Sequence, residues 1–345
     1  MAGASARLSE VRALSSGLRV SKHFLAPPKS ADSQSAQLRL LFRSTPQARA
    51  NLDLTVERVS DYVAAALTVL PPRHGLPEWL DAFSIEQESY SAARVLASTF
   101  RDAFFEGDMS SPIQELPLVL SNAPGVIIAR IKESRFEGIS ILRNNYFFVF
   151  ISPRFSGRML FTLAHELGHI LAHRDKLINP LMEGAASIGN FRKSIKSERF
   201  VDAFASCLLL PDQGVFQFLT VFRQQRGIPL NSPVGDIELL LLARFFGVSF
   251  DVAAHRCEDL KILPAGAAFS MSDHLRKNHK SPEKRAEELG LPGRETIEFP
   301  VLSSALSQEL LRGIERGEIS IGWASDHFGV SLSELLEMHR PGSDS

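Results

Sequence analysis

One short stretch constrains the fold more than any other part of the chain. Residues 161–169 read Phe-Thr-Leu-Ala-His-Glu-Leu-Gly-His and place a His-Glu-x-x-His pattern inside an apolar, helix-compatible run. On a helix, residues four apart lie on one face about a turn apart, so His165 and His169 can point at the same metal ion. Glu166 sits beside that face, and the pattern is typical of zinc metalloproteases in which this Glu is the general base.

Composition sets outer limits on the kind of protein. The chain has 345 residues, enough for about two or three domains. Hydrophobic residues make up 44% and charged residues 22%, which is ordinary for a globular protein. The net charge of -1 argues against a molecule that binds nucleic acid over its whole surface. Cys207 and Cys257 provide neither a disulfide framework nor a multi-cysteine zinc site.

The N-terminal region is basic and has no apolar core. Over residues 1–50, Lys and Arg outnumber the acids, and Ser and Ala are frequent. We interpret this region as a flexible basic extension rather than as a targeting or nucleic-acid-binding arm. No apolar run reaches the roughly 18 residues of a membrane span, and a secretion signal is not recognisable. We therefore expect a cytoplasmic protein without a membrane partner.

Changes in composition and in the spacing of apolar residues divide the chain into four regions. Residues 26–36 contain Pro, Ser and Ala in a pattern typical of a linker. Apolar residues then recur at helical spacing over 56–70 and 89–105. We expect a basic flexible extension over 1–36 and a helical region over 37–110. A metallopeptidase core is expected over 111–225, and a helical C-terminal region with helix-turn-helix-like units over 230–345.

The expected core combines a small sheet with two helices. Three β-branched or aromatic runs, bounded by Gly, Asn and Pro, predict strands over 125–131, 138–142 and 146–152. A helix follows over about 158–173, and another over about 198–210 ends at a proline. The fold class is therefore predicted to be α+β, with a minimal zincin-like core flanked by helical N-terminal and C-terminal regions.

A catalytic zinc ion needs three protein ligands and an open position for water. The sequence offers several candidates for the ligand beyond His165 and His169. His173 continues the spacing but lies about 12 Å along a helix from His165, so one ion cannot bind all three histidines. Asp175 lies six residues after His169, where some zinc proteases with this motif place the third metal ligand. Those proteases need a Gly three residues after the second His to turn the chain. That position is Ala172 here.

Glu198, on the following helix, is the preferred third ligand. Asp202 lies four residues further on the same helical face and can accept a hydrogen bond from the far nitrogen of a ligand His. Glu183, in the intervening loop, is the remaining alternative. The predicted site comprises His165, His169 and Glu198 as metal ligands, Glu166 as catalytic base and Asp202 as a supporting acid.

These residue types predict hydrolysis of a peptide bond. Zinc polarises a carbonyl and lowers the pKa of water toward neutrality, and Glu166 can pass the proton to the leaving amine. The strand over 146–152 can offer its edge to an extended peptide. Tyr146, Arg158 and the histidines are candidates for stabilising the oxyanion. We expect one Zn2+ per chain, although Mn2+ or Fe can occupy His-His-carboxylate sites.

Two stretches resemble the ImmA/IrrE family of metallopeptidases. Residues 158–169 read Arg-Met-Leu-Phe-Thr-Leu-Ala-His-Glu-Leu-Gly-His and are close to a complete match to the family pattern. Residues 198–211 read Glu-Arg-Phe-Val-Asp-Ala-Phe-Ala-Ser-Cys-Leu-Leu-Leu-Pro and match less completely. Phe200 replaces a common Glu, Val201 an Ala and Asp202 an Asn, and none of these removes an assigned ligand.

The resemblance is strong over about 120–212, weak over 234–340 and absent over 1–110. It implies an intracellular, zinc-dependent endopeptidase with a gluzincin-like fold. It also implies a protein substrate such as a transcriptional repressor, because known members cleave a repressor in stress or mobile-element regulation. A toxin-type member paired with an antitoxin is a further function within this resemblance.

A short repeated sequence motif suggests a second hypothesis. The sequence Phe-Gly-Val-Ser occurs within residues 243–249 and again within 325–331, and it is typical of the turn of many helix-turn-helix units. The segment 265–300 between the two repeats is expected to be a loop with a short helix. The chain would then be a DNA-binding or partner-binding transcriptional regulator that uses the peptidase fold as a sensor or scaffold. Acids outnumber Lys and Arg over 271–345, whereas a DNA-binding face should be basic. DNA binding is therefore not favoured.

Overall fold

The computed structural model describes residues 53–132, 136–178, 196–331 and 333–335. The expected basic extension over 1–36 and the candidate ligand Glu183 lie outside these residues. The described residues form two compact units, one made of residues 53–71 with 312–331 and 333–335, and the other of the described residues between 72 and 311. The domain boundaries expected from the sequence remain predictions.

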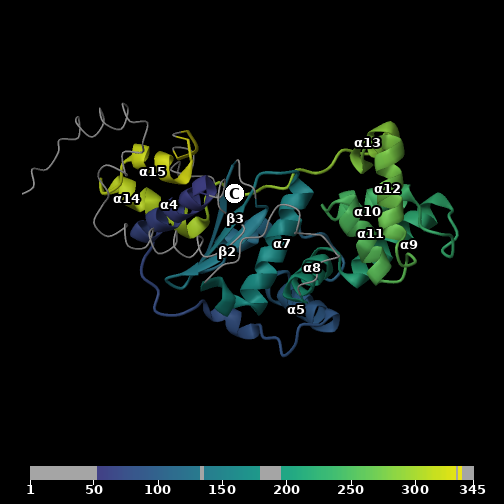
Figure 1. The fold of residues 1–345 in the computed structure, drawn as a ribbon, viewed down its shortest axis with the longest axis horizontal. Coiled ribbons are helices and arrows are strands. Elements are labelled where there is room, and N and C mark those ends of the chain that lie inside the picture. Colours follow the sequence, from purple (N-terminus) through teal and green to yellow (C-terminus); the bar gives the residue numbers. More distant parts are fainter. Residues whose placement is uncertain (1–52, 133–135, 179–195, 332, 336–345) are drawn as a thin grey trace, which may run out of the picture. The chain divides into compact units, whose positions relative to one another are not determined.

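The first unit contains helices from both ends of the chain. They are α4 (Asp53–Val69), α15 (Ile321–Phe328) and the last residues of α14 (Ser304–Glu315) (Figure 1). Tyr62 of α4 meets Phe328 of α15 edge-on, with the ring centroids 5.0 Å apart. Helices distant in sequence therefore share one apolar contact in this unit.

The second unit is built on a three-stranded sheet among its described residues. The strands are β1 (Val126–Arg130), β2 (Gly138–Arg143) and β3 (Tyr146–Ile151), in the order β1-β3-β2. β1 runs parallel to β3, and β2 runs antiparallel to it. Asn144 and Asn145 form the β2–β3 turn at positive φ, as tight hairpins require. β3 is thus central, which corrects the expectation that the strand over 146–152 presents an edge; β2 and β1 are the edge strands.

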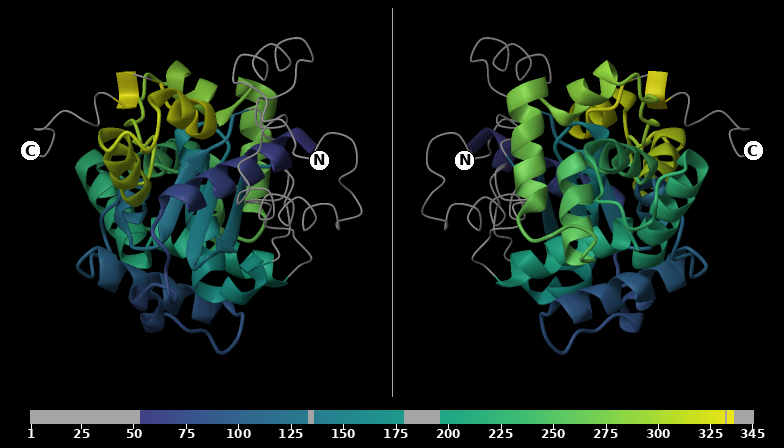
Figure 2. Two further views of the ribbon diagram at one scale, coloured as in Figure 1. Left: turned by 90° about the vertical axis from the view of Figure 1, so that its left-hand side faces the viewer. Right: turned by 90° about the vertical axis from the view of Figure 1, so that its right-hand side faces the viewer.

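Helices pack in layers on one face of this sheet. α7 (Ser156–Ala172) lies between the sheet and α8 (Lys196–Leu209), and α5 (Tyr90–Phe104) packs against α8 (Figure 1). In both views of Figure 2, the blue segment that contains α5 lies along the lower side of the teal strands and helices. The short helices η1 (Glu78–Ala82), α6 (Leu116–Asn122) and η2 (Arg174–Ile178) complete this part of the unit. The expected α+β fold class, with a zincin-like core flanked by helical regions, is confirmed.

Close packing of α7 on α8 depends on a glycine. A Cβ atom added at Gly168 would lie 3.0 Å from both Val201 and Phe204 of α8. The side chains on this face of α7 are almost completely buried, as are those facing them on α8. The two helices that carry the metal-site candidates are therefore held in direct contact.

A helical group follows the core in the same unit. It comprises α9 (Asp212–Arg226), α10 (Asp236–Phe245), α11 (Phe250–Asp259), α12 (Ala267–His279) and α13 (Pro282–Glu288). The expectation of a loop with a short helix over 265–300 is wrong, because two helices occupy this stretch. Ser281 separates them and starts α13, since its side chain accepts a hydrogen bond from the backbone N–H of Lys284.

The repeated Phe-Gly-Val-Ser motif marks two similar helix ends. Gly247 follows α10 with φ 69°, and Gly329 ends α15 with φ 64°. Residues with a side chain rarely adopt this left-handed conformation, so glycine is required at both turns. Ser249 then caps α11 by accepting a hydrogen bond from the N–H of Val252. A helix-turn-helix function of either repeat remains a prediction.

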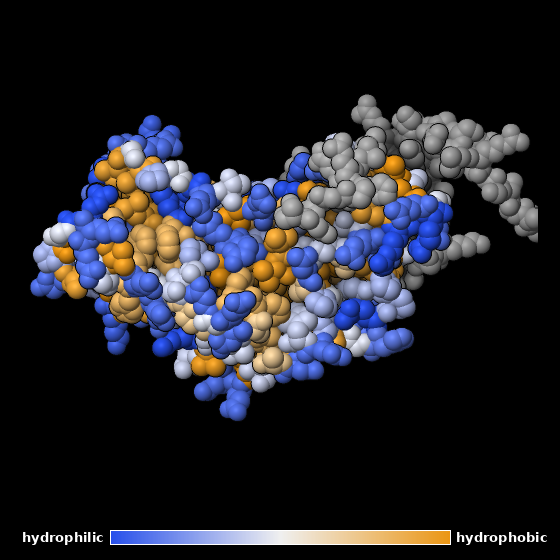
Figure 3. Space-filling model, turned by 180° about the vertical axis from the view of Figure 1, so that it is seen from behind, coloured by the Kyte–Doolittle hydropathy of each residue, from blue (hydrophilic) through white to orange (hydrophobic). Residues whose placement is uncertain are grey.

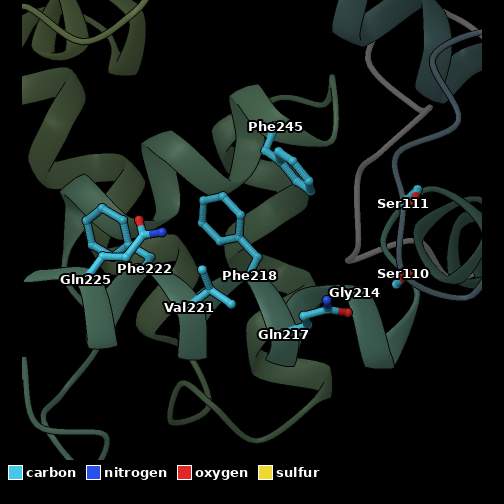
Figure 4. A pocket seen from close by; sticks show the side chains of 9 residues that line it. All are labelled: Ser110, Ser111, Gly214, Gln217, Phe218, Val221, Phe222, Gln225 and Phe245. Atoms are coloured by element: carbon cyan, nitrogen blue, oxygen red, sulfur yellow. The ribbon is translucent and has the colours of Figure 1, made fainter.

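An aromatic hollow lies on α9 and α10, and its lining includes no residue of the predicted metal site. Its volume is about 360 Å³, and it is lined by Ser110, Ser111, Gly214, Gln217, Phe218, Val221, Phe222, Gln225 and Phe245 (Figure 4). In Figure 3, apolar areas alternate with hydrophilic ones over this helical part of the unit.

No single helix in the described part of the chain is long and apolar enough to cross a membrane. The pair α8 and α9 reaches the required length and composition only when joined, and the two helices are bent by 48° at their junction.

Candidate metal centre

Helix α7 brings two histidines together on one face. His165 and His169 lie one turn apart, and their Nε2 atoms are 3.2 Å from each other. His165 is fully buried, whereas the side chain of His169 keeps 15% of its surface exposed. The pair is therefore mostly buried and is accessible through His169.

Glu198 reaches the same point from the first turn of α8. Its Oε2 lies 3.3 Å from His165 Nε2, and its Oε1 lies 3.4 Å from His169 Nε2. Bonds of about 2.0–2.1 Å to a tetrahedral zinc ion place ligand atoms about 3.3–3.4 Å apart. The three donor groups therefore fit the spacing of a zinc site, and they could hold a metal ion.

The electrostatics of the cluster favour a positive charge at its centre. Burial lowers the pKa of His165, but hydrogen bonds with Asp202 and Glu198 and the nearby charge of Glu166 raise it more, to about 10. A divalent cation can supply this positive charge in place of a proton, since ligand histidines bind metals in their neutral form.

Asp202 orients His165 from behind. It is one helical turn after Glu198 on α8, and its Oδ1 lies 2.8 Å from His165 Nδ1. Both residues are buried, with Asp202 2% exposed. A histidine that donates its Nδ1–H to a carboxylate presents the lone pair of Nε2 to a metal. With a metal bound at Nε2, this contact would hold the ring of His165 with its remaining proton on Nδ1.

Glu166 lies between α7 and the edge strand β2. Its Oε2 accepts a hydrogen bond of 2.5 Å from Ser140 Oγ on β2. A Cβ atom added at Gly138 would lie 2.6 Å from Glu166 Oε1 and 2.6 Å from Thr162 Cγ2. The carboxylate is therefore held on one oxygen, and the start of β2 has room for it only because residue 138 is a glycine.

The comparison with known families agrees with this geometry. Residues 131–258 match the model of the IrrE N-terminal-like domain, a peptidase domain. Residues 131–258 are an ImmA/IrrE family domain. The match includes β2, β3, α7 and α8, and therefore every residue that converges at the candidate centre. A search of the curated proteins gave no match.

Other residues considered from the sequence do not join the three donor groups of this ImmA/IrrE domain. His173 is buried behind His169, with its Nδ1 3.1 Å from the Nδ1 of that residue. Asp175 is exposed on η2. Neither belongs to the cluster of potential ligand atoms in the described residues.

The oxyanion candidates Arg158 and Tyr146 are held elsewhere. Arg158 donates from Nε to Glu137 Oε2 at 2.9 Å, about 10 Å along α7 from His165. Tyr146 pairs with Arg143 at the end of β2 opposite Gly138 and packs against Arg73. The geometry therefore supports neither side chain as the group that stabilises the oxyanion.

Sequence reasoning missed three residues that shape the site. Gly138 and Ser140 approach Glu166, and Glu88 contacts His173 through Oε1 and Nε2 at 3.0 Å. The short side chains on a strand next to the motif helix were a visible signal for the first two. The sequence contains no such signal for Glu88, because only the folded chain brings it next to α7.

Proposed function

We propose that this protein is a zinc-dependent endopeptidase that cleaves a cytoplasmic protein partner. The observation that carries the proposal is the convergence of His165, His169 and Glu198 at zinc-site spacing in an ImmA/IrrE domain. A transcriptional repressor is the proposed substrate class, because the family resemblance implies it. In this proposal Asp202 supports His165 and Glu166 is the general base.

The residues of the chain have separate roles in this reaction. His165, His169 and Glu198 would hold a Zn2+ ion, which supplies Lewis-acid polarisation of the scissile carbonyl and makes water more acidic. Glu166 accepts a proton from the attacking water at Oε1 and delivers it to the leaving amine. Ser140 holds Oε2 in place, so the free oxygen of the carboxylate has a defined position.

Strand β2 is the proposed docking edge for the substrate. It forms one edge of the sheet among the described residues, and Gly138 and Ser140 place it directly beside Glu166. An extended peptide that pairs with β2 would form main-chain hydrogen bonds, and these do not depend on the amino-acid sequence of the peptide. The peptide bond to be cleaved would then lie next to the general base.

The alternative regulator hypothesis receives less support from α10 and α11. α11 would be the recognition helix of such a unit, yet most of its residues are buried and it carries Asp251, Glu258 and Asp259. Its arginine, Arg256, is 0% exposed and donates to the backbone oxygen of Leu210 at 2.8 Å. A DNA-reading helix needs exposed basic side chains, so we favour a scaffold or partner-binding role for these helices.

Comparison of the wild type with Glu166→Gln tests the proposal. Zinc-loaded wild-type protein is incubated with a cell extract or with repressor candidates, and new protein N-termini are identified by mass spectrometry. We expect cleavage at defined sites by the wild type and none by Glu166→Gln, which keeps the three proposed ligands. Equal N-termini in both samples, with zinc bound to both proteins, would rule out the proposed role of Glu166 and the endopeptidase activity assigned to this centre.

A further inference from the structure

The far nitrogen of His169 contacts a second buried histidine. His169 Nδ1 lies 3.1 Å from Nδ1 of His173, which follows one turn later at the C-terminal end of α7. His173 Nε2 lies 3.0 Å from Glu88 Oε1. Three side chains therefore form one line that starts at the candidate metal centre and ends at a half-buried carboxylate.

Only one arrangement of protons fits this line when His169 binds a metal through Nε2. A neutral imidazole bound at Nε2 carries its proton on Nδ1 and must donate it. His173 Nδ1 is then the acceptor, and its own proton resides on Nε2. That proton points at Glu88, a carboxylate that accepts it. Each contact consequently has one donor and one acceptor, and each ring has a defined tautomer.

We propose that His173 and Glu88 form a hydrogen-bonded relay that orients His169 for metal binding. The inference rests on the proposed metal centre and adds two positioning residues to it. Asp202 contacts His165 directly, so the two ligand histidines receive carboxylate support by different routes. In the relay, the imidazole of His173 spans the distance between His169 and the carboxylate of Glu88.

The surroundings of the relay hold its members in place. His173 is 5% exposed, and its ring lies 5.9 Å from the ring of Phe200 on α8. Lys176 Nζ lies 3.7 Å from Glu88 Oε1 but has an exposed side chain. Arg174, next to His173 in sequence, donates to the backbone oxygen of Phe83 at 2.6 Å.

The relay extends the functional unit beyond the family match. Glu88 precedes α5 and lies outside residues 131–258, whereas His169 and His173 lie within them. The bond from Arg174 to Phe83 ties the segment that carries Glu88 to the end of α7. A part of the chain that does not match the family model therefore supplies a positioning residue to the centre.

Zinc affinity of the full chain, measured by competition with a chromophoric chelator, tests the relay. Loss of such supporting contacts typically weakens metal affinity about 10–100-fold. We expect His173→Leu to weaken zinc binding by this factor. His173→Asn should recover much of the loss, because its side-chain oxygen can replace Nδ1 as the acceptor for His169. Glu88→Ala should weaken binding less than His173→Leu does.

Control variants and spectra separate the relay from general damage to the fold. Glu86→Ala removes an exposed carboxylate two residues from Glu88 and should leave zinc affinity unchanged. Glu88→Ala should have no further effect in the His173→Leu background, because Glu88 acts through His173. Circular dichroism and the visible spectrum of the Co2+-loaded variants show whether each chain is folded and whether its site geometry has changed.

The outcomes distinguish this inference from the proposed function. Tight zinc binding by the wild type and unchanged affinity in folded His173→Leu and Glu88→Ala would overturn the relay and leave the endopeptidase proposal standing. Additive losses in the double variant would overturn the action of Glu88 through His173. Failure of the wild type to bind zinc would overturn the metal centre and the relay together.

Discussion

At the residue scale, the position of Glu166, the proposed general base, is defined by the small space around it. Glu166 is 5% exposed and is bounded by Ser140 and Gly138 of β2. Its function in the proposed reaction requires one oxygen to face the substrate while the other is held. The chemistry of Glu166 therefore depends on the absence of a side chain at residue 138.

We predict that Gly138→Ala strongly reduces peptidase activity while zinc binding is retained. The added methyl group would displace the carboxylate of Glu166, which ends a flexible side chain, and would crowd Thr162. A misplacement of about 1 Å can cost about 100-fold in rate. The turnover number and bound zinc are measured together on the same preparation. Full activity in a folded, zinc-loaded variant would contradict the tight contact between β2 and Glu166.

The sequence predicted the local part of the site better than the long-range part. His165 and His169 converge because helical geometry alone fixes residues four apart. Glu198 was expected from the acid pair that it forms with Asp202 on the next helix. Glu88 could not be expected, because its contact with His173 depends on how distant segments pack. Ser140 differs from Glu88, because its short side chain on a strand next to the motif helix was a visible signal, although its exact contact with Glu166 depends on the packing of α7 on the sheet.

At the element scale, the candidate metal centre is a product of the α7–α8 interface. α7 supplies two donor groups and α8 supplies the third, so a small shift between these helices would separate the ligands. Gly168 controls the separation, since it lies against Val201 and Phe204 of α8. The packing of the two helices and the geometry of the site are therefore linked.

We predict that Gly168→Ala destabilises the protein by about 1–3 kcal/mol and weakens zinc binding. Extra atoms in a well-packed interface typically cost this much, and here they push on the helix that carries Glu198. Urea-induced unfolding and zinc affinity are the measurements. Gly322→Ala in α15 is the matched control, because no atom lies within 4 Å of its added Cβ. It should be neutral or slightly stabilising. Equal behaviour of the two variants would show that Gly168 does not set the helix separation.

Secondary structure was more predictable than strand order. The expected strand over 138–142 corresponds to Gly138–Arg143, and the expected helix over 158–173 corresponds to Ser156–Ala172, because apolar periodicity is a local signal. The order β1-β3-β2 was not visible, since pairing partners are chosen by the tertiary fold. The two helices over 265–300 were missed because Gly and Pro suggested a loop, although Ser281 caps a helix there.

At the scale of the whole molecule, residues 72–311 share one packed unit. Cys207 lies on α8, which packs with the sheet, and Cys257 lies on α11, in the helical group that follows. Both cysteines are nevertheless buried in the same cluster of apolar side chains. Burial raises the pKa of both thiols, that of Cys257 to about 12. The two cysteines therefore report on the integrity of this unit.

We predict that neither cysteine of the native protein reacts with a thiol reagent at pH 8. The thiolate is the reactive form, and a raised pKa keeps almost all of the thiol protonated below that pKa. In denaturant both thiols should react, because their pKa values return to about 8.5. A colorimetric thiol assay counts the reactive groups in each state. Rapid reaction of Cys257 in the folded protein would contradict the packing of α11 into the common core.

The zinc content of the purified 345-residue chain, after loading and removal of excess metal, tests the central claim most directly. Wild type is measured beside His169→Ala, Glu198→Ala and Glu166→Gln by mass spectrometry of the metal. We predict about one zinc ion per chain in the wild type and in Glu166→Gln, and almost none in the two ligand variants. A wild-type chain without zinc, or a Glu198→Ala chain that keeps its zinc as firmly as the wild type, would contradict the proposed centre.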